Sequence, residues 1–158
     1  MNIFYLTHNP MECAEQHCDK HVVKMILEYA QLLSTAHRLL DNNQKVYKTA
    51  FKNHPSTIWT RENKSNYRWL SMLFYYLCQE YTHRYGKVHI TYKKLWLELN
   101  QIPKNIANGE FTTPPQCMPE DVKHPLCTKK AYQDYYKKYK VHFAKWTNRD
   151  KPEFMRYT

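Results

Sequence analysis

Hydrophobic and polar positions recur at helical spacing through most of this chain, beginning with a long stretch from Asn9 to Leu40. Asn9, Pro10 and Glu12 have the spacing of a helix start, with a capping side chain, a proline in the first turn and a carboxylate three residues after the cap. No Gly or Pro follows within the stretch, so the pattern predicts one helix over residues 9–40. The apolar face expected to pack into a core consists of Val22, Ile26, Tyr29, Leu33 and Ala36.

Two later segments repeat this helical pattern. Residues 56–85 carry apolar positions at spacings of three and four, and Gly86 is a natural C-terminal stop. The pattern of this second helix also allows a break near residues 63–65. A shorter helix is predicted over residues 90–99.

The remaining segments are less regular. Residues 1–8 predict a short extended lead-in, and the Pro-rich residues 102–126 predict a long irregular loop. Residues 128–146 are basic and rich in Tyr, and they predict a C-terminal helix. Only 2 of the 158 residues are Gly, which disfavours β folds rich in tight hairpins. The sequence therefore predicts a single all-α domain of three to four main helices with a long Pro-rich loop.

A polar stripe runs along the first predicted helix beside its apolar face. Its members are His17, His21, Lys24, Glu28, Gln31 and Thr35. A solvated surface is the ordinary explanation of such a stripe, and Lys24 and Glu28 have the spacing of an ordinary ion pair within a helix. Several titratable groups on one rigid helix instead favour catalysis. In that interpretation Lys24 is a nucleophile, Glu28 is a general base, and His17 and His21 position the substrate.

The same residue types raise the alternative of a metal site. His17 and His21 are four residues apart, with Cys13 one turn earlier. This spacing fits no common zinc site, so we expect hydrogen-bonded histidines and neither a metal nor another cofactor. The five cysteines form no CxxC motif, and the N-terminus does not resemble a signal peptide, so we expect free thiols in a cytoplasmic protein. No apolar run approaches the length of a membrane span.

The net charge of +10 indicates a polyanionic partner. Basic residues between positions 48 and 68 alternate with the aromatic residues Phe51, Trp59, Tyr67 and Trp69. Cations can bind phosphates while rings stack on bases or wedge between them. The predicted nucleic-acid contacts are Lys48, Lys52, His54, Arg61, Lys64 and Arg68.

Several short motifs resemble those of pyrimidine-dimer DNA glycosylases of the phage endonuclease V type. Ala14-Glu15-Gln16-His17 matches an A-[DE]-Q-H run, and Phe51-Lys52-Asn53-His54-Pro55 matches a Y-R-N-H-P motif. Arg84-Tyr85-Gly86 stands where relatives have R-G-[YF], and Tyr135-Tyr136-Lys137 is similar to an aromatic, basic C-terminal segment. The composition, rich in Lys, Asn and Tyr, is typical of phage-encoded proteins. The resemblance implies a small all-α protein that binds double-stranded DNA, flips a base out of the helix and excises it.

The resemblance also implies a nucleophile, and here the chain departs from the pattern. Family members use the α-amine of a small residue exposed by removal of the initiator Met. Asn2 does not favour that removal, so the amine of Met1 would serve. The positions of the family's Arg and essential Glu are occupied by Val23 and Lys24, with Glu28 one turn further on.

Three functions therefore stay open. The first is a DNA glycosylase or abasic-site lyase that uses Lys24 or the Met1 amine. The second is a non-catalytic nucleic-acid-binding protein on the same scaffold. The third is a nucleotide or small-molecule enzyme whose polar helix face lines a pocket.

Overall fold

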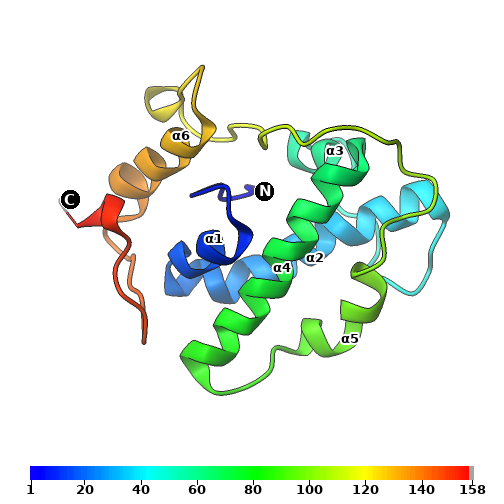
Figure 1. The fold of residues 1–158 in the computed structure, drawn as a ribbon, viewed down its shortest axis with the longest axis horizontal. Helices are drawn as coiled ribbons and strands as arrows, with labels where there is room; N and C mark the ends of the chain where they lie inside the picture. Colours follow the sequence, from blue (N-terminus) through cyan, green and yellow to red (C-terminus); the bar gives the residue numbers. More distant parts are fainter. Residues whose placement is uncertain (157–158) are drawn as a thin grey trace.

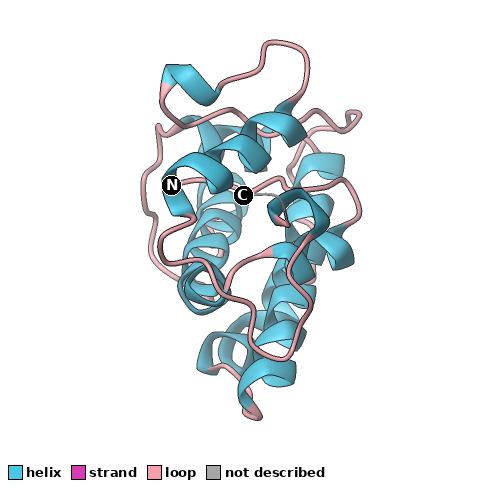
Figure 2. Cartoon of the chain, turned by 90° about the vertical axis from the view of Figure 1, so that its left-hand side faces the viewer, coloured by secondary structure: helices cyan, strands magenta, loops and turns pink. Residues whose placement is uncertain are grey.

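The chain consists of helices and loops, and no strand occurs within residues 1–156, the part that the computed structural model describes (Figure 1; Figure 2). This confirms the all-α prediction. Two long helices, α2 (Asp19–Asp41) and α4 (Lys64–Tyr85), pack against each other at the centre. Four shorter ones surround them: α1 (Pro10–Gln16), α3 (Pro55–Glu62), α5 (Ile90–Leu99) and α6 (Thr128–Tyr135).

The single helix predicted over residues 9–40 is in fact two helices. Asn9 caps α1 as expected, because its side chain accepts the N–H of Glu12 at 3.1 Å. The chain then turns into extended conformation at His17 and Cys18 before α2 begins. No Gly or Pro marks this break. Tertiary hydrogen bonds stabilise it instead: the N–H of Cys18 donates to the Tyr136 hydroxyl, and the N–H of Asp19 donates to the carbonyl of Lys145.

The predicted helix over residues 56–85 is likewise divided, into α3 and α4, at Asn63. This residue is extended, and its side chain accepts the N–H of Asn66 at 2.9 Å, so it starts a new helix. Gly86 ends α4 in the left-handed conformation (φ 71°) that the sequence suggested. The helix predicted at residues 90–99 agrees with α5.

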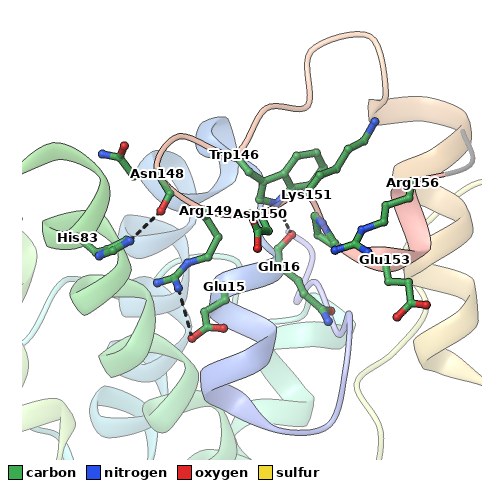
Figure 3. Close-up of a pocket in the computed structure, with 11 residues that line it drawn as sticks. Glu15, Gln16, His83, Trp146, Asn148, Arg149, Asp150, Lys151, Glu153 and Arg156 are labelled. Atoms are coloured by element: carbon green, nitrogen blue, oxygen red, sulfur yellow. Dashed lines mark hydrogen bonds and ion pairs between the residues drawn. The ribbon is translucent and has the colours of Figure 1, made fainter.

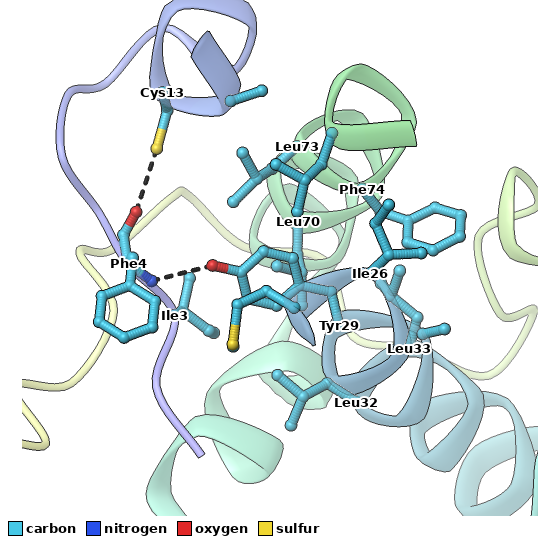
Figure 4. Packing of buried hydrophobic residues seen from close by; sticks show 14 of the residues in the cluster. Ile3, Phe4, Cys13, Ile26, Tyr29, Leu32, Leu33, Leu70, Leu73 and Phe74 are labelled. Carbon is cyan, nitrogen blue, oxygen red and sulfur yellow. Dashed lines mark hydrogen bonds between the residues drawn. The ribbon is translucent and has the colours of Figure 1, made fainter. Parts of the chain in front are cut away.

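The N-terminal segment is part of the core (Figure 4). Ile3 and Phe4 are buried, and they pack beside Tyr29 of α2. The N–H of Phe4 donates to the Tyr29 hydroxyl at 3.1 Å, and the thiol of Cys13 donates to the Phe4 carbonyl at 3.1 Å. Met1 lies at the start of α3, because its carbonyl accepts the Ser56 hydroxyl at 3.0 Å.

The C-terminal helix predicted over residues 128–146 ends earlier. The chain between α5 and α6 runs past α3 (Figure 1), and α6 continues as one π-helical turn, Tyr136–Lys140. Beyond Lys140 the backbone leaves the helix and returns to α1, where the Trp146 indole donates to the carbonyl of Gln16 at 2.9 Å. A continued helix would not bring residues 145–147 to the start of α2, where they bind Asp19.

A buried ion cluster joins α4 to the other elements. Arg84 donates to Glu80 at 2.8 Å, to Asp19 at 3.0 Å and to the carbonyl of Glu15 at 2.9 Å. Burial alone would raise the pKa of Glu80, but hydrogen bonds from Arg149 and Arg84 outweigh it and the pKa is lowered. The arginine of the Arg84-Tyr85-Gly86 motif therefore stabilises the fold.

Candidate active site

The polar stripe contains both buried and exposed residues. His17 and His21 are buried, whereas the Lys24 side chain is 66% exposed. Glu28 is half-buried and Thr35 is buried. The stripe therefore does not form one continuous polar surface.

His17 uses both ring nitrogens inside the protein. Nδ1 donates to the carbonyl of Cys13 at 2.7 Å, and Nε2 accepts the hydroxyl of Tyr29 at 2.8 Å. Burial lowers the pKa of His17 to about 4, so the ring is neutral at pH 7. These bonds join α1, α2 and, through Tyr29, the N-terminal segment.

His21 is likewise buried and lies in the first turn of α2. Its ring stacks on Phe4, with centroids 4.2 Å apart, and its Nδ1 accepts the hydroxyl of Tyr136 at 2.7 Å. Burial, followed by the charges of His17 and Lys140, lowers the pKa of His21 to about 2. Both rings are therefore neutral at pH 7.

Lys24 and Glu28 form the ion pair that their spacing suggested. Lys24 Nζ lies 3.8 Å from Glu28 Oε2, which is beyond ordinary hydrogen-bond length. That carboxylate oxygen is buried and finds no hydrogen-bond partner within residues 1–156. An unpartnered buried carboxylate oxygen is costly unless a ligand or water completes it.

The N-terminal amine and His54 come together although 53 residues separate them. The amine of Met1 lies 3.3 Å from Nε2 of His54. His54 is the capping residue of α3, and its Nδ1 accepts the N–H of Ser56 at 3.1 Å. Pro55 holds His54 in extended conformation (ψ 140°), which directs the ring over the start of the helix.

This capping bond determines which nitrogen of His54 carries the proton. Burial, with the positive charge of the N-terminus, lowers the pKa of His54, so the ring is neutral at pH 7. Because Nδ1 accepts from Ser56, the proton of the neutral ring is on Nε2, facing Met1.

Other buried polar atoms near this pair have no partner within the described residues. They include Asn2 Oδ1, next to Met1, and Thr57 Oγ1, in the first turn of α3. The Ser56 hydroxyl is anchored on the Met1 carbonyl and lies 3.7 Å from Cys117 Sγ. The sequence suggested no catalytic or binding role for Asn2, Ser56 or Thr57. The run His54-Pro55-Ser56-Thr57 was the available signal, since it opens a helix with polar side chains.

Glu28 lies on the same face of α2 as Thr35, because two helical turns separate the two residues. Thr35 Oγ1 accepts the N–H of Ala50 at 3.0 Å, four residues before His54. The face of α2 that carries Glu28 is therefore directed toward the segment leading into His54.

The predicted nucleic-acid contacts fall into two groups. Lys48 and Lys52 are exposed beside His54, in the segment before α3. Lys64 and Arg68 line a separate hollow of about 400 Å³ on α4, with Trp69 and Phe111 in its wall. The remaining contact, Arg61, is only partly exposed, and one of its guanidinium nitrogens is buried without a partner within residues 1–156.

A larger hollow of about 710 Å³ lies where the C-terminal segment crosses α1 and α4 (Figure 3). Glu15 and Arg149 form an ion pair across it at 3.9 Å, and His83 contacts the Asn148 carbonyl at 2.8 Å. None of the predicted catalytic residues lines this hollow.

The structure also bears on metals and membranes. Within residues 1–156, no three His, Cys, Asp or Glu side chains are grouped closely enough to hold a metal ion. Among the helices of that same part of the chain, none combines the length and the apolar character that a membrane span needs.

Comparison with known proteins supplies the class that this helical, basic protein belongs to. The model of a family described as pyrimidine dimer DNA glycosylase matches residues 1–94. The chain belongs to this family of DNA glycosylases, whose substrate is DNA. The match includes α1 to α4, Met1 and His54, whereas α6 and the C-terminal segment lie outside it. Neither curated proteins nor solved structures give a match to this chain.

Proposed function

We propose that this protein is a base-excision enzyme, a DNA glycosylase with abasic-site lyase activity, that uses the α-amine of Met1 as its nucleophile. The observation that carries the proposal is the contact between the Met1 amine and Nε2 of His54. It places an uncharged imidazole 3.3 Å from the proposed nucleophile. Lys24, the other candidate nucleophile, has a mostly exposed side chain, and its nearest acidic partner is Glu28.

The proposed reaction begins with a nucleotide flipped out of double-stranded DNA, because its C1′ atom is shielded in the stack. The amine lone pair forms a bond to C1′, and the bond from C1′ to the base breaks. The base leaves with that electron pair and takes up a proton. The attached amine then loses a proton, its lone pair forms the C=N bond, and the C1′–O4′ bond opens with O4′ taking up the proton, which gives an imine between Met1 and the sugar.

The lyase step follows from the imine. Removal of a proton from C2′ expels the 3′ phosphate and cuts the strand, and water then hydrolyses the imine and restores the amine. Glu28 is the group proposed to accept and return these protons and to stabilise the cationic sugar. Its buried oxygen without a partner in residues 1–156 and its position on the face of α2 toward His54 support this role.

The test uses two duplexes, one with a single cyclobutane pyrimidine dimer and one with a single abasic site. We expect strand cleavage on both, and a covalent protein–DNA adduct when borohydride reduces the imine. Salt-sensitive binding without cleavage or adduct would contradict the proposal and would favour a non-catalytic DNA-binding protein on this scaffold.

A further inference from the structure

Phe51 is an exposed aromatic residue beside the proposed active site. Four aromatic residues alternate with basic ones in this part of the sequence, and three of them are core residues: Trp59, Tyr67 and Trp69 are at most 6% exposed. The Phe51 side chain, in contrast, is 60% exposed. Burial in this protein therefore does not account for Phe51.

The backbone of Phe51 is held in an unfavourable conformation. Its φ angle is 51°, in the left-handed region that residues with a Cβ rarely adopt. Such strain persists only where the surrounding structure fixes it, and it is concentrated at functional positions. Here Ala50 is held on both sides by Thr35, whose Oγ1 accepts its N–H at 3.0 Å and donates to its carbonyl at 3.3 Å.

The turn that follows connects Phe51 to the active site. The carbonyl of Phe51 accepts the N–H of His54 at 3.0 Å, so the ring is presented one tight turn before the residue that contacts Met1. Lys48 and Lys52 are exposed on the same segment. A protein that opens a DNA duplex needs cations that bind the phosphates and an apolar side chain that wedges between bases. Lys48, Lys52 and the Phe51 ring are groups of these two kinds, next to the proposed nucleophile.

We propose that Phe51 is a wedge that inserts into the base stack of duplex DNA beside the nucleotide delivered to Met1. Lys48 and Lys52 bind the flanking phosphates, and the ring replaces the stacking that the flipped base gives up. Because its turn is already ordered, little conformational entropy is lost on insertion. This inference rests on the proposed function, because Phe51 would open the duplex at the nucleotide on which Met1 acts.

The test measures opening of the duplex without requiring chemistry. The probe is a duplex with one cyclobutane pyrimidine dimer and 2-aminopurine next to it, whose fluorescence rises when it is unstacked. The decisive variant is Phe51→Asn, because Asn tolerates positive φ and removes the ring, so its melting temperature should be equal to or above that of the wild type. The matched control is Leu97→Asn, which removes an apolar side chain that is 85% exposed on α5.

We expect the wild type, Leu97→Asn and Phe51→Trp to raise the fluorescence severalfold at saturation, and Phe51→Asn to lose at least four-fifths of that rise. An equal rise with Phe51→Asn, or no rise with the wild type, would overturn the wedge. Borohydride trapping on a single-stranded abasic oligonucleotide needs no opening of a duplex, so Phe51→Asn should retain the wild-type yield. No adduct there with the wild type would contradict the proposed chemistry, while the fluorescence comparison would still decide the role of Phe51.

Discussion

The hydroxyl of Tyr29 lies 2.8 Å from Nε2 of His17, and it also accepts the N–H of Phe4 at 3.1 Å. Because the hydroxyl accepts from Phe4, its own proton is free to be donated to His17. This relay connects α2 to the end of α1 and to the segment that carries Met1. His17, which the sequence suggested as a substrate-positioning residue, therefore has both ring nitrogens engaged within the protein.

The first prediction concerns this relay. Tyr29→Phe removes the hydroxyl and leaves a buried imidazole nitrogen and a buried N–H without partners. Each such group costs about 1–3 kcal/mol, so we expect the free energy of unfolding to fall by about 2–6 kcal/mol. Urea denaturation measures this loss. Tyr85→Phe, at a side chain 38% exposed, is the control and should change stability by less than about 0.5 kcal/mol. Equal effects of the two substitutions would show that the relay contributes nothing.

The second prediction concerns pH. The pKa of His17 falls from 6.5 to about 4 on folding and that of His21 to about 2, so the unfolded chain binds protons that the folded protein does not. Stability is therefore fully present above pH 6.5 and is lost as the pH falls toward these folded values. At pH 5 each histidine accounts for a loss of about 2 kcal/mol relative to pH 7.5.

Denaturation of the wild type and of His21→Phe at pH 7.5 and pH 5 tests this expectation. The variant keeps a ring against Phe4 but cannot bind the proton, so its loss between the two pH values should be smaller by about 2 kcal/mol. His142→Gln, at an exposed position, should behave as the wild type does. The same loss in all three proteins would be inconsistent with a neutral, buried His21.

Much of the fold could be predicted from the sequence, because it depends on local signals. Asn9 and Pro10 start α1, Gly86 ends α4, and the apolar stripe from Val22 to Ala36 is buried. The break at His17 and Cys18 could not be predicted, since it depends on partners such as Tyr136, which lies 118 residues from Cys18. The early end of the C-terminal helix likewise depends on contacts with α1 and α2.

The candidate site was predictable only in part, for the same reason. Helical spacing placed Lys24 and Glu28 together, and they do form an ion pair. The meeting of Met1 with His54 depends on the buried path of the N-terminal segment, which spacing does not reveal. Helical spacing already places Trp59 on the apolar side of its helix, but only the structure shows that the Phe51 ring is exposed.

A third prediction concerns DNA binding. Lys48 and Lys52 are exposed beside His54, and each phosphate contact contributes about 0.9 to the slope of log K against log salt concentration. Replacing both by Ala should weaken binding and flatten this slope by about 2. The control Lys93→Ala/Lys94→Ala removes the same charge from exposed positions on α5. Equal slopes for the two double variants would exclude the Lys48–Lys52 segment from the interface.

A fourth prediction concerns Glu28. Glu28→Gln keeps the shape of the side chain but removes its charge and its capacity to accept a proton. We expect strand cleavage to fall by about 10²–10⁴-fold, with DNA affinity and the melting temperature nearly unchanged. Glu62→Gln, at an exposed position on α3, is the matched control. Cleavage within about threefold of the wild type would remove Glu28 from the mechanism.

The identity of the amine that forms the imine tests the central claim most directly. The protein is reduced with borohydride on an abasic-site duplex, digested with nuclease and protease, and the modified residue is located by mass spectrometry. We predict a sugar remnant on the α-amine of Met1, the group that lies 3.3 Å from His54, and none on Lys24. A remnant on Lys24, or on any other lysine with Met1 unmodified, would contradict the account.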